Sequence, residues 1–250
     1  MAMDRVEAVV HTMNSFHCGG PVFYASLPRG PRDSVNPKGD GTNGEETKHR
    51  LVFTLWDHLR TRESPLWKHC QSSWRAALQI QSIGPLGRPQ LLVGEYEGPA
   101  VSFSECGGNV WAALCGDESD IGIDVAGTDE FQREYPFRRV FHPAELQLAL
   151  RLTDGDLGNA SALLWSVKEA VVKALGCAFH LVDPRQITIY PSTEGAAKEN
   201  VGYIFPVRLS GKALMRFSAD TGRSLWVCSL PQGKRWLSIA LLNRRPSAHE

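Results

Sequence analysis

The clearest pattern of apolar and polar positions in the chain lies between residues 159 and 176. Apolar residues recur there three or four positions apart, at Leu163, Val167, Ala170, Val171 and Ala174. This spacing is typical of the buried face of an amphipathic helix. Asn159 or Ser161 can cap the start of the helix and Gly176 can end it. The pattern therefore predicts a long helix with one face in a core.

Shorter patterns elsewhere predict further helices and strands. Helical spacing indicates helices at residues 48–60, 66–77, 130–135 and 143–152. Short apolar or alternating runs indicate strands at residues 78–83, 90–93, 100–103, 110–114, 121–125, 186–190, 203–209, 213–218, 225–230 and 236–242. Residues 6–24 hold a short apolar segment that fits a strand, and residues 28–47 are rich in proline, glycine and polar residues, which predicts a long mobile loop. Because helices precede strands and the set then recurs, we expect an α+β fold.

Composition and charge are those of an ordinary globular protein. Of the 250 residues 42% are hydrophobic and 22% charged, and 27 basic residues balance 27 acidic ones. This balance gives no indication of nucleic acid or a membrane as a partner, and we expect neither. The six cysteines show no zinc-site spacing, no apolar run is long enough for a membrane span, and the first residues do not resemble a signal peptide. We therefore expect a cytoplasmic protein with reduced thiols.

Two features carry candidate chemistry. Trp165, Glu169 and Lys173 lie one turn apart on a second face of the long predicted helix. A carboxylate and an ammonium so placed can hold a metal and a phosphate together, or they can form a surface ion pair of little energetic value. Asp124 ends a short apolar strand, where it can be a metal ligand or a cap before residue 128. The residues by themselves leave both choices open.

Four segments together resemble a known family. They are a Gly-Arg-Pro turn at residues 87–89, a Ser-Phe-Ser segment at residues 102–104, a Gly-Ile-Asp strand at residues 122–124 and a Trp-x-x-Lys-Glu-Ala-x-x-Lys helix at residues 165–173. In this order and spacing they resemble the 4'-phosphopantetheinyl transferase superfamily, in particular its single-chain Sfp type. The last two segments are specific in combination. The resemblance covers residues 80–180 well, the C-terminal strands loosely and the first 45 residues hardly at all.

The resemblance implies an α+β fold of two pseudo-symmetric halves, each a small, mainly antiparallel sheet with a long helix. The boundary would fall near residue 127, with residues 1–127 and 128–250 on either side of the active-site cleft. The implied reaction transfers 4'-phosphopantetheine from coenzyme A to a serine of an acyl carrier protein or a peptidyl carrier domain, and releases 3',5'-ADP. It implies Mg²⁺, with Mn²⁺ as the other choice. An internally duplicated fold supplies both sides of the cleft, so a monomer is expected.

The resemblance also assigns residues to the reaction. Asp124 and Glu169 would hold the metal ion, and Glu169 would be the general base, directly or through a metal-bound water. Lys173 would face the α- or β-phosphate and assist the leaving group. Lys168 would reach the same phosphates or point to solvent. Trp165 is expected to pack at the start of the helix rather than to stack on a base.

Further residues would bind coenzyme A. Arg88 suits phosphate oxygens because its guanidinium can donate two parallel hydrogen bonds. Ser102 stands where the family has a serine that contacts the ligand, and Phe103 can pack on adenine or ribose. Arg50, at the start of the first predicted helix, would contact the nucleotide 3'-phosphate.

Two positions depart from the family pattern. Phe103 replaces a histidine that helps to bind a coenzyme A phosphate, and a phenylalanine cannot donate a hydrogen bond. Ala126 replaces an acid found in many members, although Mg²⁺ readily keeps water in place of a missing ligand. Two alternatives to an active transferase therefore remain. One is a catalytically weakened protein that binds coenzyme A or a carrier protein; the other is a metal-dependent phosphohydrolase using Asp124 and Glu169, which lacks the further ligands of a two-metal site.

A carrier protein would dock near residues 137–141. Arg138 and Arg139 would face an acidic carrier helix, and Phe137 and Phe141 would supply apolar contacts. The alternative places the phenylalanines in the core and the arginines in solvent. Glu145 also matches a family acid, for which we expect a structural role.

Overall fold

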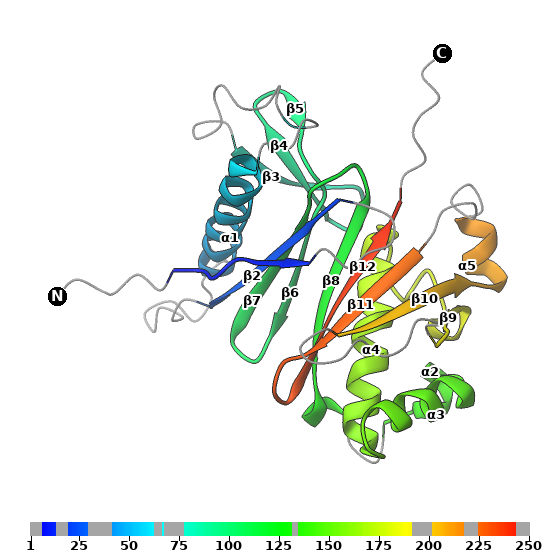
Figure 1. Cartoon of the computed structure of the whole chain (residues 1–250). Coiled ribbons are helices and arrows are strands. Elements are labelled where there is room, and N and C mark those ends of the chain that lie inside the picture. The colour runs from blue at the N-terminus through cyan, green and yellow to red at the C-terminus, as the bar shows by residue number, and fades with distance from the viewer. Residues whose placement is uncertain are drawn as a thin grey trace.

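The computed structural model describes residues 7–13, 20–29, 42–62, 67, 78–131, 135–191, 202–217 and 225–243. In these ranges the chain forms two antiparallel sheets that lie side by side, each covered by a long helix (Figure 1). A small third sheet extends from the N-terminal one. The expected α+β class, with mainly antiparallel sheets and one long helix in each half, is confirmed.

The N-terminal sheet has the strand order β1-β2-β7-β6. Its strands are β1 (His11–Met13), β2 (Val22–Pro28), β6 (Val101–Cys106) and β7 (Asn109–Cys115). Helix α1 (Thr42–Thr61) covers this sheet and buries Leu51, Leu55 and Leu59 as their spacing predicts. The helix begins six residues before the expected residue 48, so the prediction of a loop for residues 42–47 is wrong. Thr47 is buried in this first part of the helix, which indicates that tertiary packing outweighs the polar local sequence.

A three-stranded sheet adjoins the N-terminal half. It consists of β3 (Leu78–Ile83), β4 (Arg88–Val93) and β5 (Tyr96–Glu97), paired in that order. The β3–β4 turn contains Gly84 and Gly87, both with positive φ, a conformation that glycine adopts without steric cost. The strand at residues 78–83 is as expected. Of the expected Gly-Arg-Pro turn at residues 87–89, Arg88 and Pro89 already belong to β4. Most of the helix expected at residues 66–77 lies outside the described residues.

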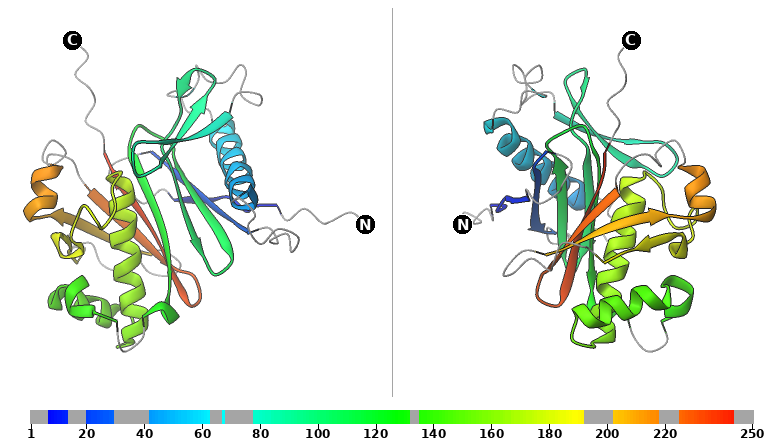
Figure 2. Two further views of the ribbon diagram at one scale, coloured as in Figure 1. Left: turned by 180° about the vertical axis from the view of Figure 1, so that it is seen from behind. Right: turned by 45° about the vertical axis from the view of Figure 1, so that its right-hand side comes forward.

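The C-terminal sheet has the strand order β8-β12-β11-β10-β9. Its strands are β8 (Asp120–Gly127), β9 (Ile187–Ile189), β10 (Tyr203–Leu209), β11 (Leu225–Pro231) and β12 (Arg235–Leu242). Helix α4 (Leu157–Ala174) packs across β8 and β12, and the helices α2 (Phe137–Val140) and α3 (Pro143–Leu152) lie beside its N-terminal part (Figure 2). The cap of α4 is Asp156, whose side chain accepts a hydrogen bond from the Asn159 backbone N–H. The expected caps at Asn159 and Ser161 are therefore wrong by about one turn.

Two further expectations are wrong. Residues 213–218, expected as a strand, belong in part to helix α5 (Gly211–Arg216), which buries only Ala213 and leaves Leu214 and Met215 exposed. Such a short apolar run fits both the helical period of 3.6 residues and the strand period of 2. The helix expected at residues 130–135 is absent from its described positions: a 3₁₀ turn, Thr128–Glu130, ends before Phe131, and neither Phe131 nor Tyr135 is helical. Residues 132–134 lie outside the described residues.

The two large sheets meet along their edge strands β6 and β8. Strand β8 pairs with β12 along its whole length, so by hydrogen bonding it belongs to the C-terminal sheet. A division of the chain near residue 127 stays a prediction. The cysteines in the described ranges carry free thiols, and none of the helices described is both long and apolar enough to cross a membrane.

Candidate active site

Gly122 brings helix α4 unusually close to strand β8. A Cβ atom at this position would lie 2.0 Å from the Ala170 carbonyl oxygen and 2.6 Å from the Ala174 backbone nitrogen. Glycine permits this approach because it has no side chain. The glycine of the Gly-Ile-Asp segment therefore sets the distance between the strand that carries Asp124 and the helix that carries Glu169 and Lys173.

Asp124 and Lys173 form a hydrogen-bonded ion pair across this contact. The Lys173 Nζ lies 2.7 Å from Asp124 Oδ1 and also donates to the Ile123 carbonyl oxygen at 3.0 Å. Helical spacing places Glu169 one turn before Lys173 on the same face of α4. Burial raises the pKa of the Glu169 carboxyl, the Asp124 charge raises it further, and the Lys173 ammonium opposes both. The structure thus brings together the three charged residues at which the two motifs pointed.

Two serines of strand β6 hold strand β8 in place. The Ser102 and Ser104 hydroxyl oxygens accept hydrogen bonds from the backbone N–H groups of Ile123 and Val125, at 3.0 and 3.1 Å. The Ser104 hydroxyl also donates to Asp124 Oδ1 at 3.0 Å. Both serines of the Ser-Phe-Ser segment therefore join the two sheets, and Ser104 orients the Asp124 carboxylate. Sequence reasoning assigned a ligand contact to Ser102 and no role to Ser104.

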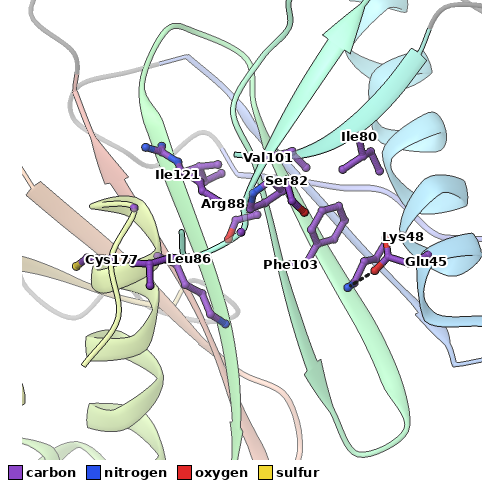
Figure 3. A pocket seen from close by; sticks show the side chains of 15 residues that line it. Glu45, Lys48, Ile80, Ser82, Leu86, Arg88, Val101, Phe103, Ile121 and Cys177 are labelled. Carbon is purple, nitrogen blue, oxygen red and sulfur yellow. Dashed lines mark hydrogen bonds and ion pairs between the residues drawn. The ribbon is translucent and has the colours of Figure 1, made fainter. Parts of the chain in front are cut away.

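A pocket of about 250 Å³ opens between the two halves (Figure 3). Its charged lining residues come from three elements: Glu45 and Lys48 from α1, Arg88 from β4 and Lys173 from α4. Its remaining lining includes Ser102 and Phe103 on β6, Ile121 on β8 and the end of α4 at Gly176 and Cys177. A second pocket of about 300 Å³ adjoins it and shares Arg88 and Gly176. Binding of coenzyme A in a cleft between the halves stays a prediction, for which this pocket is the candidate place.

Arg88 lines both pockets and is paired within the protein. Its guanidinium donates to the Asp120 carboxylate and packs against Gly176, two residues beyond the last residue of α4. A cation at this end of a helix is favoured by the helix dipole. Gly176 has a positive φ and its N–H bonds back to Lys173, as in a glycine-ended helix. A phosphate ligand of Arg88 would therefore have to share its guanidinium with Asp120.

Lys48 lines the pocket although no sequence motif contains it. Its ammonium lies 5.8 Å from the centre of the Phe103 ring, within the range of a cation–π contact. Arg50, the residue expected at this position, is exposed on α1 and is not among the residues that line the pocket. The two positions are two apart, so they point to different sides of a helix. The sequence signal that points to Lys48 is Glu45, three residues earlier: an acidic residue is typical of the first turn of a helix and would place Lys48 inside α1.

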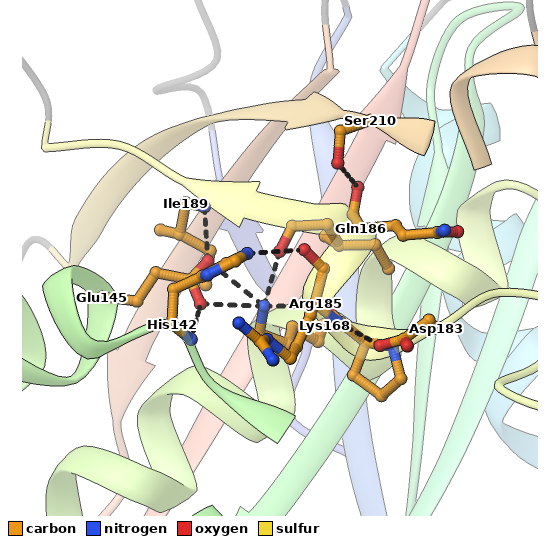
Figure 4. Close-up of polar contacts among 10 residues, drawn as sticks. His142, Glu145, Lys168, Asp183, Arg185, Gln186, Ile189 and Ser210 are labelled. Atoms are coloured by element: carbon orange, nitrogen blue, oxygen red, sulfur yellow. Dashed lines mark hydrogen bonds and ion pairs between the residues drawn. The ribbon is translucent and has the colours of Figure 1, made fainter. Parts of the chain in front are cut away.

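Lys168 lies in neither of its two expected places. Its side chain is 0% exposed and its ammonium lies 3.1 Å from the Glu145 carboxylate (Figure 4). It also donates to the carbonyl oxygens of Pro184 and Ile187. Glu145 in turn accepts hydrogen bonds from the backbone N–H groups of His142 and Ile189. This satisfied ion pair ties α3 and β9 to α4, so Lys168 is not available to a phosphate in the pocket, while Glu145 has the structural position expected.

Aromatic side chains pack around the N-terminal part of α4. Trp165 lies 5.0 Å from Phe179 and 6.4 Å from Tyr135 between ring centres, which fits the expected packing role. Phe141 is buried and Phe137 packs against the same core, whereas Arg138 and Arg139 are exposed. Ala126, on the same face of β8 as Asp124, is buried in that core and provides no charged group.

The carboxylates of Asp124 and Glu169 suit a divalent cation with a preference for oxygen ligands. The side-chain hydrogen bonds that Asp124 accepts in the described part of the chain both end on Oδ1, so Oδ2 remains for a cation. The raised pKa of Glu169 reflects in part the unfavourable proximity of the two acids, which a cation between them would relieve. The described residues contain no cluster of three or more acidic, histidine or cysteine ligands. Such an ion would thus take its other ligands from water or substrate, as Mg²⁺ readily does.

Comparisons with known proteins agree with the motifs. Residues 120–217 match the family model of the 4'-phosphopantetheinyl transferase superfamily. Comparison with curated protein sequences gives no match.

Solved structures with detectable similarity include three acyl carrier protein synthases. The ACPS–CoA complex of Chronobacterium ammoniagenes is 19% identical, covers 52% of this chain and 99% of its own, and has a TM-score of 0.42. Holo-ACP-synthase from Plasmodium yoelii is 18% identical over 49% of this chain and 92% of its own, with a TM-score of 0.38. AcpS from Mycobacterium tuberculosis is 23% identical over 50% of this chain and 97% of its own, with a TM-score of 0.35. Similarity at this level supports no statement about function. The match of residues 120–217, which contain both the Gly-Ile-Asp strand and the Lys-Glu-Ala helix, shows that this part of the chain is similar to the 4'-phosphopantetheinyl transferase superfamily.

Proposed function

We propose that this protein transfers 4'-phosphopantetheine from coenzyme A to a serine of an acyl carrier protein or peptidyl carrier domain, with Mg²⁺ or Mn²⁺. The observation that carries the proposal is the convergence of Asp124, Lys173 and Glu169 beside a pocket lined by basic residues. The match to the family model supports the reaction class. The active site is the region between the two sheets.

The chemistry assigns a separate task to each residue. The carrier serine oxygen attacks the β-phosphorus of coenzyme A, the bond from this phosphorus to the bridging oxygen breaks, and 3',5'-ADP leaves. Glu169 accepts the serine proton, and its raised pKa makes it a better base than an exposed carboxylate. Lys173, fixed by Asp124 and the Ile123 carbonyl, stabilises the negative charge on the departing group. A divalent cation held by Asp124 and Glu169 would neutralise charge on the pyrophosphate.

The geometry supports this assignment because the groups are positioned before a ligand arrives. Asp124 is held by Ser104 and Lys173, and the strand that carries it is hydrogen-bonded on both sides, to β12 and to the serines of β6. Fixed dipoles and charges lower an activation barrier more effectively than groups that must reorganise. The Lys168–Glu145 pair anchors the opposite face of α4 and so limits its rotation.

Intact-protein mass spectrometry of an apo carrier protein tests the proposal. The carrier is incubated with this protein, coenzyme A and Mg²⁺, and a gain of about 340 Da, one phosphopantetheinyl group, is expected. A chelator and the Asp124→Ala variant should each abolish the gain, whereas Arg60→Met, on the far part of α1, should not. Transfer by Asp124→Ala at the wild-type rate would refute the assigned site. Absence of transfer to any of several carriers, with coenzyme A still bound, would favour a non-catalytic binding protein, for which Phe103 and Ala126 are the motivating departures.

A further inference from the structure

Three buried serine side chains connect helix α4 to the C-terminal sheet. Ser166 belongs to α4, Ser229 to β11 and Ser238 to β12, and each is 0% exposed. The Ser166 and Ser238 hydroxyl oxygens lie 2.7 Å apart, as do those of Ser238 and Ser229. The three hydroxyls thus form a hydrogen-bonded chain in the apolar layer between the helix and the sheet, and the transfer chemistry proposed above gives them no task.

The hydrogen bonds of this chain run in one direction. Ser166 donates to the Leu163 carbonyl oxygen, one turn earlier in α4, at 3.0 Å. A hydroxyl carries a single hydrogen, so Ser238 donates to Ser166 and Ser229 donates to Ser238. Ser238 is therefore the residue of the sheet that holds the helix. A buried polar network in which the members are satisfied favours one arrangement of its surroundings.

Ser238 is also the neighbour of Asp124 in the sheet. The two residues are paired in the register of β12 and β8, so both side chains lie on the sheet face that α4 covers, with Cβ atoms about 5 Å apart. Ser166 precedes Lys173 by two helical turns, which brings the two side chains within about 20° of one direction around the helix axis. The helix therefore makes two polar contacts with adjacent positions of the sheet, Ser166 with Ser238 and Lys173 with Asp124.

The Ser238–Ser166 bond restricts α4 in a way that its apolar contacts do not. Leucine, valine and alanine side chains form most of the helix face in the core, and their attraction to the sheet is non-directional. Gly122 sets how closely the helix approaches β8. A hydrogen bond adds a requirement on distance and angle. Because a serine oxygen is only one bond from Cβ, little movement of the helix is compatible with this hydrogen bond.

We propose that Ser166 and Ser238 are positioning residues for phosphopantetheine transfer. Their hydrogen bond fixes the rotation and the position of α4 on the sheet, and so holds Glu169, which follows Ser166 by one turn, beside Asp124. This inference rests on the proposed function and adds residues that act through Glu169 and Lys173 without touching the substrate.

The transfer rate of serine-to-alanine variants, measured on an apo carrier protein by intact-protein mass spectrometry at saturating coenzyme A, tests the inference. Ser166→Ala should fold, because alanine is the residue most favourable to a helix. A catalytic group misplaced by about 1 Å loses on the order of a hundredfold in rate, so kcat should fall roughly ten- to a hundredfold in Ser166→Ala and in Ser238→Ala. The affinity for coenzyme A, measured by titration calorimetry, should change less than about threefold, because Lys48 and Arg88 of the pocket lie on other elements.

Ser229→Ala is the matched control. It removes the same hydroxyl from an equally buried position but leaves the Ser238–Ser166 bond in place, so its kcat should stay within about twofold of wild type. The double variant Ser166→Ala/Ser238→Ala should lose no more kcat than either single variant, because both substitutions remove one and the same contact. A core that is merely softened would instead lower kcat in Ser229→Ala as well.

Three results would overturn the inference. They are wild-type kcat in Ser166→Ala, an equal loss of kcat in Ser229→Ala and Ser238→Ala, and a loss in the double variant equal to the product of the two single losses. Absence of transfer by the wild-type protein would refute the proposed function instead. The crystal structure of Ser166→Ala then decides whether the bond positions the helix: displacement of Glu169 away from Asp124 supports this, and an unmoved helix overturns it.

Discussion

Replacing Gly122 with alanine should separate this protein's fold from its activity. The added Cβ would lie 2.0 Å from the Ala170 carbonyl oxygen, where an ordinary contact is at least 3.4 Å, so α4 must retreat from β8 by roughly 1.4 Å. The atoms it meets belong to the helix backbone, so no side-chain rotation can relieve the contact. Overpacking of this kind costs about 1–3 kcal/mol in the free energy of unfolding. A shift of about 1 Å in a catalytic group can cost on the order of a hundredfold in rate.

The assay combines urea denaturation with the rate of phosphopantetheine transfer under conditions where the variant remains folded. We expect Gly122→Ala to unfold at lower urea concentration and to lose about a hundredfold in kcat/KM, because Lys173 and Glu169 move with the helix away from Asp124. Gly44→Ala is the matched control. A Cβ there meets only the ends of the Arg29 and Glu105 side chains, at 3.8 and 3.9 Å, and alanine in a helix should stabilise by about 0.5–1 kcal/mol.

Either of two results would refute the reasoning. Wild-type stability and wild-type transfer in Gly122→Ala would mean that the close contact between β8 and α4 is not required. Reduced stability with normal transfer per folded molecule would mean that this contact does not set the geometry of the charged residues.

Three further predictions test separate parts of the structure. Burial and the Asp124 charge raise the pKa of Glu169, so ionisation of this carboxyl opposes folding. The protonated carboxyl contributes its full stabilisation below pH 4.5, the ordinary pKa of a glutamate. This stabilisation is lost as pH rises through the higher pKa of the folded state. Metal-free Glu169→Gln should therefore melt at a higher temperature than wild type at pH 7, by a margin that shrinks below about pH 4.5, while its transfer activity is abolished; equal melting at pH 7 would contradict this. Lys168→Met should lose about 3–5 kcal/mol in urea denaturation because it leaves the Glu145 charge buried and unpaired, and Lys168→Met/Glu145→Leu should recover much of that loss; a single variant as stable as wild type would show that the pair is dispensable. Phe103→His should not weaken coenzyme A binding in calorimetry, since it restores a hydrogen-bond donor, and a severe loss would mean that the Phe103 ring itself makes a contact essential for binding.

Sequence patterns predict the long, regular elements better than the short or locally polar ones. Helix α4 and the strand Asp120–Gly127 have long, unambiguous patterns, and both are present within a few residues of the expected bounds. The sequence predicts a later start for α1 because residues 42–47 are polar locally, although Thr47 is buried in the folded protein. The sequence predicts a strand in place of the helix Gly211–Arg216, because six residues with few buried positions do not define a helical or strand period.

In the candidate site too, some features follow from the local sequence and others depend on the tertiary structure. Spacing along the chain determined that Glu169 and Lys173 share a helix face and that Asp124 lies in a buried strand, because these are local consequences of helical and strand periods. Only the tertiary structure decided which of them meet: Asp124 and Lys173 are 49 residues apart in sequence, and they are joined because Gly122 lets the helix approach the strand. The same holds for the lysines. The sequence treats Lys48, Lys168 and Lys173 alike as cations on helices, but packing buries Lys168 against Glu145 and brings Lys48 and Lys173 to one pocket from opposite halves. Burial and long-range contact depend on the whole fold, which no local period contains.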